Sequence, residues 1–364
     1  MKIITTDAFS FAAKPKIIAL LFWIIIFIAL LGYAIFKQYI LPKYFFFDEN
    51  TITQFMQWGA QFKPGDSYAS TAKFFSILGV DRATLWFPPF AAVLIIAQYL
   101  YHLKKSKARH FTLIELVIFV FLAFLSVTYM SMLSKDFIVA LVITPFIFFA
   151  KRGLPGILTW SMIALLYATY FRTYWFIMIP IFWGLYTVFR VTRKRLYLIL
   201  SVPLTLLALS FTFSLFLGLD LDNFRTTIND SRIEGGDNNA RTMILPWIDG
   251  GGPVLSWLNS TITWVTLMIP MPLFILLSPY YLFIASLITV LFYKLWIAFF
   301  QILAHKSQPD LAACSALIIS FIAIQAIFEP DYGSYVRHLA PLYPLCLYVI
   351  FKSRTLTHTK KTAA

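Results

Sequence analysis

Two carboxylates, an arginine and a histidine lie within ten residues, Glu329–His338, between two apolar stretches of the chain. An ionised side chain at the centre of a membrane helix costs about 2.5–3.5 kcal/mol, so charges at such places mark functional sites by default. Arginine holds a phosphate or pyrophosphate through two parallel hydrogen bonds and keeps its charge when buried. A nearby carboxylate can take the proton of a sugar hydroxyl and make that oxygen a nucleophile. We predict that Arg337 binds the phosphates of a lipid-linked substrate, that Asp331 or Glu329 is the base, and that His338 assists the charge balance.

Two apolar stretches are too short to cross a bilayer alone, since a crossing needs about 20 residues. Only 14 residues separate Asp136 from Lys151, and only 13 separate His338 from Lys352. The polar residues before each stretch are therefore expected within the outer half of the hydrocarbon. They are Lys135 and Asp136 in one case, and Arg337 and His338 in the other.

A third charge, Arg172, lies at the outer junction of two predicted spans, among aromatic residues. All three groups face the same side on the predicted topology, which indicates a cavity that opens outward. Aromatic rings there can stack on sugar rings. The further candidate residues are Arg172, Arg241, Lys135, Asp136, Tyr174 and Tyr332 for substrate binding, and Asp48 for catalysis.

Each of these residues also has a purely structural interpretation. Asp136 is placed to cap the next helix, with Lys135 extending toward the membrane surface. Arg172 can bond the carbonyl groups of a broken turn, and the aromatic residues around it are typical of a membrane interface. The spacing of Asp331 and Arg337 allows an ion pair that only holds a loop. A lone histidine is commonly a core residue.

The chain is strongly apolar: 60% of its 364 residues are hydrophobic, 13% are charged, and the mean hydropathy is +0.77. This composition excludes an ordinary soluble domain, and apolar runs of about 20 residues predict membrane helices instead of short alternating strands. We predict an all-α polytopic membrane protein with a single transmembrane domain, 1–364. The first apolar run lacks a small-residue cleavage site, so we interpret it as a retained span and not a signal peptide.

Ten spans are predicted, with both termini in the cytoplasm. They lie near 17–36, 84–101, 111–131, 137–150, 154–171, 173–189, 196–217, within 263–300, 311–328 and 338–351. Region 263–300 is too long for one crossing and contains three prolines, so a re-entrant or broken segment in the outer leaflet, followed by one span, is predicted there. Two long outer segments remain: 37–82, with amphipathic helices at the interface, and 218–261, a loop that covers the substrate.

Lysine and arginine outnumber aspartate and glutamate by 30 to 16, which gives a formal charge of +14. Most of these basic residues fall in segments placed on the cytoplasmic side, whereas the acidic residues placed there are Asp7, Glu115 and Asp310. This asymmetry follows the positive-inside rule, which sets the orientation of a membrane protein. The positive charge therefore does not indicate a nucleic-acid partner.

Metal and disulfide chemistry are weakly indicated. Cys314 and Cys346 lie in apolar stretches and have neither metal-ligand spacing nor a disulfide framework. Glu329-Pro330-Asp331 and Asp48-Glu49 offer oxygen ligands, but no histidine cluster accompanies them. We expect no metal and no cofactor.

The order of several short motifs resembles the Wzy-type O-antigen and capsular polysaccharide polymerases of bacteria, over most of the chain. The motifs are Lys-Tyr-Phe-Phe-Phe-Asp-Glu-Asn-Thr-Ile (43–52), Ser-Lys-Asp (134–136), Phe-Arg-Thr-Tyr-Trp (171–175), Asn-Ala-Arg-Thr (239–242) and Glu-Pro-Asp-Tyr-Gly-Ser-Tyr-Val-Arg-His (329–338). The resemblance implies a fold similar to the GT-C glycosyltransferases, in the bacterial inner membrane. It also implies transfer of a glycan from undecaprenyl pyrophosphate to the terminal sugar of a lipid-linked repeat unit at the periplasmic face.

Functional arginines in the outer loops are a further implication of the resemblance, and Arg172, Arg241 and Arg337 correspond to them. The implied partners are an undecaprenyl-pyrophosphate-linked oligosaccharide, membrane lipid and a chain-length regulator protein. The chain departs from the family pattern of two long outer loops rich in Arg-x-Gly repeats, because it has one such loop. Two alternatives stay open: an O-antigen ligase or another GT-C glycosyltransferase, and, as a non-enzyme, a transporter or flippase of lipid-linked oligosaccharides.

Overall fold

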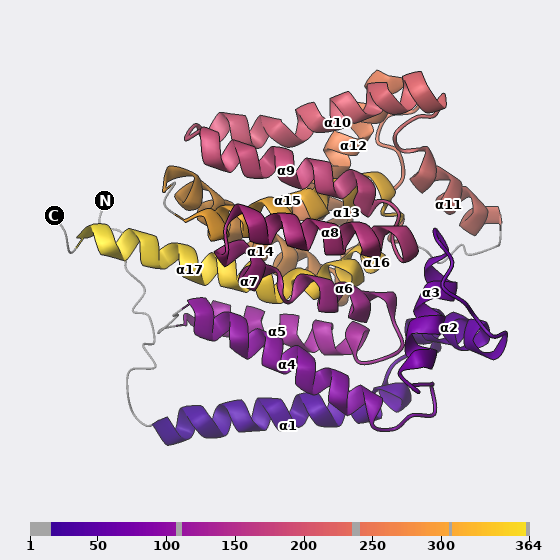
Figure 1. Cartoon of the computed structure of the whole chain (residues 1–364), viewed down its shortest axis with the longest axis vertical. Coiled ribbons are helices and arrows are strands. Elements are labelled where there is room, and N and C mark those ends of the chain that lie inside the picture. The colour runs from indigo at the N-terminus through magenta and orange to yellow at the C-terminus, as the bar shows by residue number, and fades with distance from the viewer. Residues whose placement is uncertain (1–15, 107–110, 235–240, 306–307, 362–364) are drawn as a thin grey trace. The chain divides into compact units, whose positions relative to one another are not determined.

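The computed structural model describes residues 16–106, 111–234, 241–305 and 308–361 (Figure 1). Regular structure in these ranges is helical, apart from an isolated antiparallel bridge between Met243 and Asp331. The all-α prediction is therefore confirmed for this part of the chain. Some predicted features lie outside it: the charged residues Asp7, Lys2, Lys14, Lys107, Arg109 and Lys306, both chain ends, and Asn239 and Ala240 of one motif.

Five helices in the described ranges are long and apolar enough to cross a membrane. They are Leu21–Ile40 within α1 (Lys16–Ile40), α5 (Leu113–Met130), α10 (Arg195–Leu217), α14 (Pro279–Ala304) and α15 (Pro309–Phe328). Two shorter apolar helices are α8 (Leu154–Tyr170) and α9 (Trp175–Val191). By length and composition, the chain has the helices of an all-α membrane protein.

The helices cluster in two compact units, of which unit 1 is formed by the described residues of Met1–Leu141 and by Ala340–Thr355. Helices α1, α4 and α5 pack on one another in this unit, and α2 packs on α3. Arg354 forms a charge-assisted pair with Glu115 in the first turn of α5. The elements of unit 1 are α1, η1 (Lys43–Phe46), α2 (Phe47–Gln57), α3 (Ser67–Ile77), α4 (Phe87–Ser106), α5, most of α6 (Lys135–Ile143), η2 (Ala340–Leu342) and most of α17 (Tyr343–Lys361).

Unit 2 is formed by the described residues of Val142–Leu339 and Leu356–Ala364. Its central helix is α15, in which every residue from Leu311 to Ile327 is buried. Helices α7, α9, α12 and α14 pack around it (Figure 1). A helix that is apolar on all sides suits such a central position, and α15 thereby fixes the place of the segment that follows it. The other elements are α7 (Phe146–Lys151), α8, α9, α10, α11 (Asn223–Glu234), α12 (Pro253–Met268), α13 (Met271–Ile275), α14 and α16 (Tyr332–Leu339).

Prolines explain where the observed helices differ from the predicted spans. Segment 137–150, predicted as one span, is divided between α6 and α7 at Pro145, which lacks an N–H and disfavours helical backbone in the residue before it. The break predicted within 263–300 is present, because α12 and α13 end near Pro270 and Pro279 and α14 follows as one long helix. Leu277, between α13 and α14, has a positive φ of 49°.

Candidate functional site

The turn that follows α15 is set by residues that end one helix and start another. The Glu329 N–H still donates to the Gln325 carbonyl at 2.8 Å, but Pro330 has no N–H with which to continue the helix. One carboxylate oxygen of Asp331, Oδ1, then accepts the backbone N–H of Ser334 at 2.7 Å, which is the contact of an N-cap residue. The Glu329 carboxyl is therefore held at a sharp turn between α15 and α16.

The Glu329 side chain is enclosed and hydrogen-bonded, and the residue is 1% exposed. Its Oε1 accepts the hydroxyl of Ser334, and its Oε2 lies 2.8 Å from Nδ1 of His338. The pKa of the Glu329 carboxyl is raised to about 8, first by burial and then by the negative charge of Asp331, while the Ser334 bond and the Arg337 guanidinium oppose this shift. Glu329 can therefore hold or release a proton near neutral pH.

Two arginines approach the other ring nitrogen of His338. Its Nε2 lies 3.2 Å from Nη1 of Arg172 and 3.3 Å from Nη2 of Arg337. Guanidinium nitrogens only donate hydrogen bonds, so Nε2 must be the acceptor and Nδ1 must carry the hydrogen that faces Glu329. These contacts therefore indicate a neutral His338 ring, whose basic nitrogen, Nε2, faces two cations.

Arg172 reaches His338 from the turn between α8 and α9. Its carbonyl accepts the N–H of Trp175 at 3.0 Å, and its Nη1 donates to the hydroxyl of Tyr174 at 2.9 Å. The Tyr174 ring stacks on Phe328, the last residue of α15, with 5.6 Å between ring centroids. These contacts hold the turn against the end of α15 and hold the Arg172 guanidinium in place.

Asp331 pairs with an arginine that the sequence did not single out. Its Oδ2 lies 2.7 Å from Nη1 of Arg232, in α11. The ion pair considered between Asp331 and Arg337 is not formed, because Oδ1 caps α16 and Oδ2 faces Arg232. The Arg337 guanidinium instead contacts His338.

The backbone of the loop 218–261 pairs with the same turn. Ile244 donates its N–H to the carbonyl of Pro330 at 2.8 Å, and Tyr332 donates its N–H to the carbonyl of Thr242 at 3.0 Å. These two bonds form the isolated bridge of the fold. Residues 242–244 of this loop therefore form part of the wall of the site.

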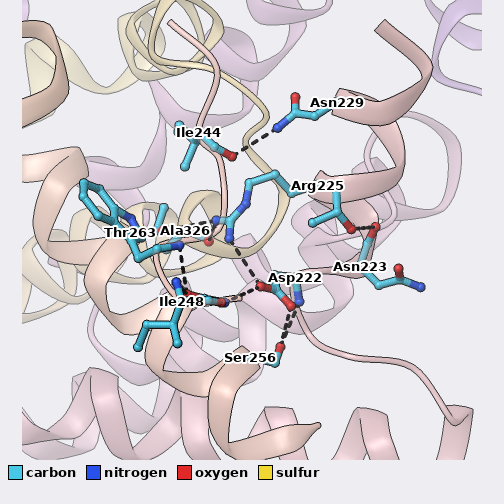
Figure 2. Close-up of polar contacts among 12 residues, drawn as sticks. Asp222, Asn223, Arg225, Asn229, Ile244, Ile248, Ser256, Thr263 and Ala326 are labelled. Atoms are coloured by element: carbon cyan, nitrogen blue, oxygen red, sulfur yellow. Dashed lines mark hydrogen bonds and ion pairs between the residues drawn. The ribbon is translucent and has the colours of Figure 1, made fainter. Parts of the chain in front are cut away.

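Arg225, in α11, donates a hydrogen bond to the last turn of α15 (Figure 2). The side chain is fully buried; its Nη1 donates to the Ala326 carbonyl at 2.9 Å and to the Thr263 hydroxyl at 3.1 Å. Ala326 lies four residues before Pro330, so its carbonyl lacks the usual helical donor. Arg225 supplies this missing donor, and Asp222 balances its charge with Oδ2 at 3.7 Å from Nη2.

Asp222 is itself held by α12, as Figure 2 shows. Its Oδ1 accepts the hydroxyl of Ser256 at 2.8 Å, and its Oδ2 accepts the amide of Asn259 at 3.3 Å. The amide of Asn229 donates to the carbonyl of Ile244 at 3.1 Å. In the described part of 218–261, α11 and α12 thus hold the backbone that pairs with the turn.

Other predicted site residues lie in unit 1. Asp48 accepts the hydroxyl of Tyr68 at 2.7 Å, and its Oδ2 lies 3.7 Å from Nζ of Lys135, which also sits 3.6 Å from the centroid of the Tyr68 ring. Asp136 is buried, but the residue that caps α6 is Ser134, whose hydroxyl accepts a first-turn N–H at 3.1 Å. Ser134 has this role because a cap must precede the first helical residue.

A further buried pair of charged residues in unit 1 was not predicted. Lys37 donates to the carbonyl of Thr128 at 3.1 Å and to the hydroxyl of Ser131 at 2.8 Å. Glu49 accepts the N–H of Leu133 at 3.3 Å. Burial raises the pKa of the Glu49 carboxyl, and the charge of Lys37 acts in the opposite direction. The neighbouring carboxylates after the first span were the one signal for this pair.

The predicted residues therefore fall into separate groups. The structure brings together Glu329, Arg337, His338, Arg172 and Tyr174, with Asp331 beside them, and it places Asp48, Lys135 and Asp136 in unit 1. Tyr332 is buried, so its ring offers no open stacking face, and Arg241 is exposed beside the backbone bridge. Sequence reasoning missed Arg225, Arg232 and Ser334; the proline at the end of α15 was the signal that a donor from elsewhere was needed.

Among the described residues, no group of three or more histidine, cysteine, aspartate or glutamate side chains is arranged to hold a metal ion. Comparisons with protein-family models, with curated proteins and with solved structures gave no match.

Proposed function

We propose that the chain is a membrane glycosyltransferase that polymerises lipid-linked oligosaccharide repeat units into O-antigen or capsular polysaccharide. The observation that carries the proposal is the meeting of Arg172, Arg337, His338 and Glu329 at the end of the apolar helix α15. Two guanidinium cations beside a proton-accepting pair suit a reaction in which a pyrophosphate leaves and a hydroxyl attacks. The order of sequence motifs supports the polymerase class.

On this proposal, Arg172 and Arg337 bind the pyrophosphate of the donor, an oligosaccharide on undecaprenyl pyrophosphate. The bond between the anomeric carbon and the pyrophosphate oxygen breaks, and its electron pair stays on that oxygen. The guanidinium groups stabilise the negative charge that develops there. Arg241, exposed on the loop, is a third candidate for contact with the donor.

His338 and Glu329 form the proton-accepting pair of the proposal. The acceptor sugar gives its hydroxyl proton to Nε2 of His338, and its oxygen forms the new bond to the anomeric carbon. The Glu329 carboxyl, 2.8 Å from Nδ1, stabilises the imidazolium. Asp331 suits the role of base less well, because the Ser334 N–H and Arg232 occupy its two oxygens. Asp48 is retained as a candidate in unit 1.

The setting of this reaction is also proposed. We place it at the periplasmic face of a bacterial inner membrane, on a GT-C-like fold with ten crossings and both termini in the cytoplasm. A chain-length regulator protein is the proposed partner. The long apolar helices support the membrane setting.

Gel profiling of surface polysaccharide in a deletion strain tests the polymerase class. Loss of a polymerase leaves single repeat units on the surface glycan, since export and ligation continue. Loss of a ligase or of a flippase leaves no surface repeat units. Long polysaccharide that persists in the deletion strain rules out the proposed function.

Arg337→Lys tests the arginine fork at the same site. Lysine keeps the charge but cannot bind a phosphate through two parallel bonds, so we expect polymer formation to fall by about 100-fold, the order of loss for one transition-state donor. The amount of protein in the membrane should not change. Arg193→Lys, at an exposed position, is the matched control. Full activity of Arg337→Lys contradicts the role of Arg337.

A further inference from the structure

The basic nitrogen of His338 is covered by the residues that are proposed to bind the donor. Its Nε2 lies 3.2 Å from Nη1 of Arg172 and 3.3 Å from Nη2 of Arg337. Both arginines can only donate hydrogen bonds, so their hydrogens face the Nε2 lone pair. In this arrangement Nε2 cannot accept a proton from a sugar hydroxyl.

The second ring nitrogen does not offer an alternative. Nδ1 lies 2.8 Å from Oε2 of Glu329 and carries the hydrogen of the neutral ring. Glu329 is enclosed in turn, because the Ser334 hydroxyl occupies Oε1. Proton uptake from an acceptor sugar thus requires that the arginines first leave Nε2.

A phosphate group competes with His338 for the hydrogen bonds of the two arginines. Hydrogen bonds from a guanidinium to an anionic oxygen are about twice as strong as bonds to a neutral acceptor such as imidazole. Arg172 also has an anchor that does not depend on His338, since its Nη1 donates to the Tyr174 hydroxyl at 2.9 Å. Its guanidinium can therefore exchange His338 for a phosphate oxygen while the turn that carries it stays in place.

We infer that the pyrophosphate of the donor uncovers the base: it draws Arg172 and Arg337 away from His338, and Nε2 becomes able to accept a proton only once the donor is bound. This inference rests on the proposed function of the same site. It orders the reaction, with the donor first and the acceptor hydroxyl second. It also keeps the base covered while no leaving group is present, so an acceptor that arrives alone is not deprotonated.

Diethyl pyrocarbonate tests the inference without measuring polymer. The reagent acylates an imidazole nitrogen through its free lone pair, so its rate at His338 reports whether Nε2 is covered. The purified full-length protein in detergent is treated with and without inorganic pyrophosphate, and the peptide that contains His338 is quantified by mass spectrometry. We expect pyrophosphate to raise the rate by roughly threefold to tenfold, the equivalent of about one neutral hydrogen bond.

Two variants and one internal control sharpen the measurement. Arg172→Gln and Arg337→Gln each remove a covering guanidinium, so His338 should react faster without pyrophosphate, and pyrophosphate should change the rate less. His305, whose Nδ1 contacts the Gln301 carbonyl at 2.7 Å at the end of α14, should keep its rate throughout. If a variant fails to fold, the comparison in the wild-type protein still decides.

Binding of inorganic pyrophosphate, followed by calorimetry on the same samples, separates the possible failures. If pyrophosphate binds and His338 reacts at the same or a lower rate, the inference is overturned and the proposed donor site stands. If pyrophosphate does not bind, both the donor site and the inference are overturned.

Discussion

Burial of the Glu329 carboxyl links its protonation to folding. Its pKa is raised to about 8, mainly by burial and then by the charge of Asp331, against an ordinary value of 4.5. Between these two pH values the folded protein keeps a proton on Glu329 that the unfolded chain has released. The contribution of the protonated carboxyl to the free energy of unfolding is therefore fully present below about pH 4.5 and is lost as pH rises through about 8.

Replacing Glu329 with glutamine should remove this pH dependence. The amide is neutral at every pH and similar in size, so the unfolding temperature of Glu329→Gln in detergent should fall less than that of the wild type between pH 4.5 and 8. Glu234→Gln, at an exposed position of α11, should leave the wild-type curve unchanged. If the unfolding temperatures of wild type and Glu329→Gln change with pH in parallel, the raised pKa of Glu329 is contradicted.

At the scale of elements, the end of α15 depends on a side chain from α11. The Ala326 carbonyl lacks a helical donor because residue 330 is proline, and Arg225 supplies the bond at 2.9 Å. Arg225→Leu removes that donor and leaves Asp222 buried without its cation. We expect a loss of about 3–5 kcal/mol in the free energy of unfolding.

The double variant with Pro330→Ala tests whether the cap causes this loss. Alanine restores a backbone N–H that can bond the Ala326 carbonyl, so Arg225→Leu should cost about 1 kcal/mol less in the Pro330→Ala background. Thr227→Ala, on the exposed face of α11, is the control and should show no such coupling. Equal costs of Arg225→Leu in both backgrounds would show that the guanidinium does not act as a helix cap.

The sequence predicted the long helices well, because their apolar runs and prolines are local signals. α15 runs from Pro309 to Phe328, and the predicted span was 311–328. The contacts of the site were harder to predict, because they join residues distant in sequence. Arg232 and Asp331 are 99 residues apart, and no pattern in either segment reveals the pairing. The partner that the spacing allowed, Arg337, was nearer in sequence, but Asp331 caps α16 with Oδ1 and pairs with Arg232 through Oδ2.

At the scale of the whole molecule, cysteine labelling tests the proposed orientation. Cys314 and Cys346 are buried, so a membrane-impermeant maleimide should label the wild type weakly. Asp249→Cys and Arg193→Cys place a thiol at exposed positions of the loop 218–261 and of the connection between α9 and α10. In intact spheroplasts we expect labelling of Asp249→Cys alone, and of both variants after permeabilisation. Labelling of Arg193→Cys in intact spheroplasts contradicts the proposed topology.

The cap on α15 also imposes an order on biosynthesis. Arg225 is made 101 residues before Ala326, which at ordinary synthesis rates of 5–20 residues per second is a delay of roughly 5 to 20 seconds. During that interval Asp222 can hold the guanidinium, and the Thr263 hydroxyl can do so once residue 263 has been made, while the acceptor at the end of α15 does not yet exist. α15 therefore packs against a guanidinium that the earlier part of the chain has already positioned, and a chain that stops before residue 326 leaves this donor without its carbonyl acceptor.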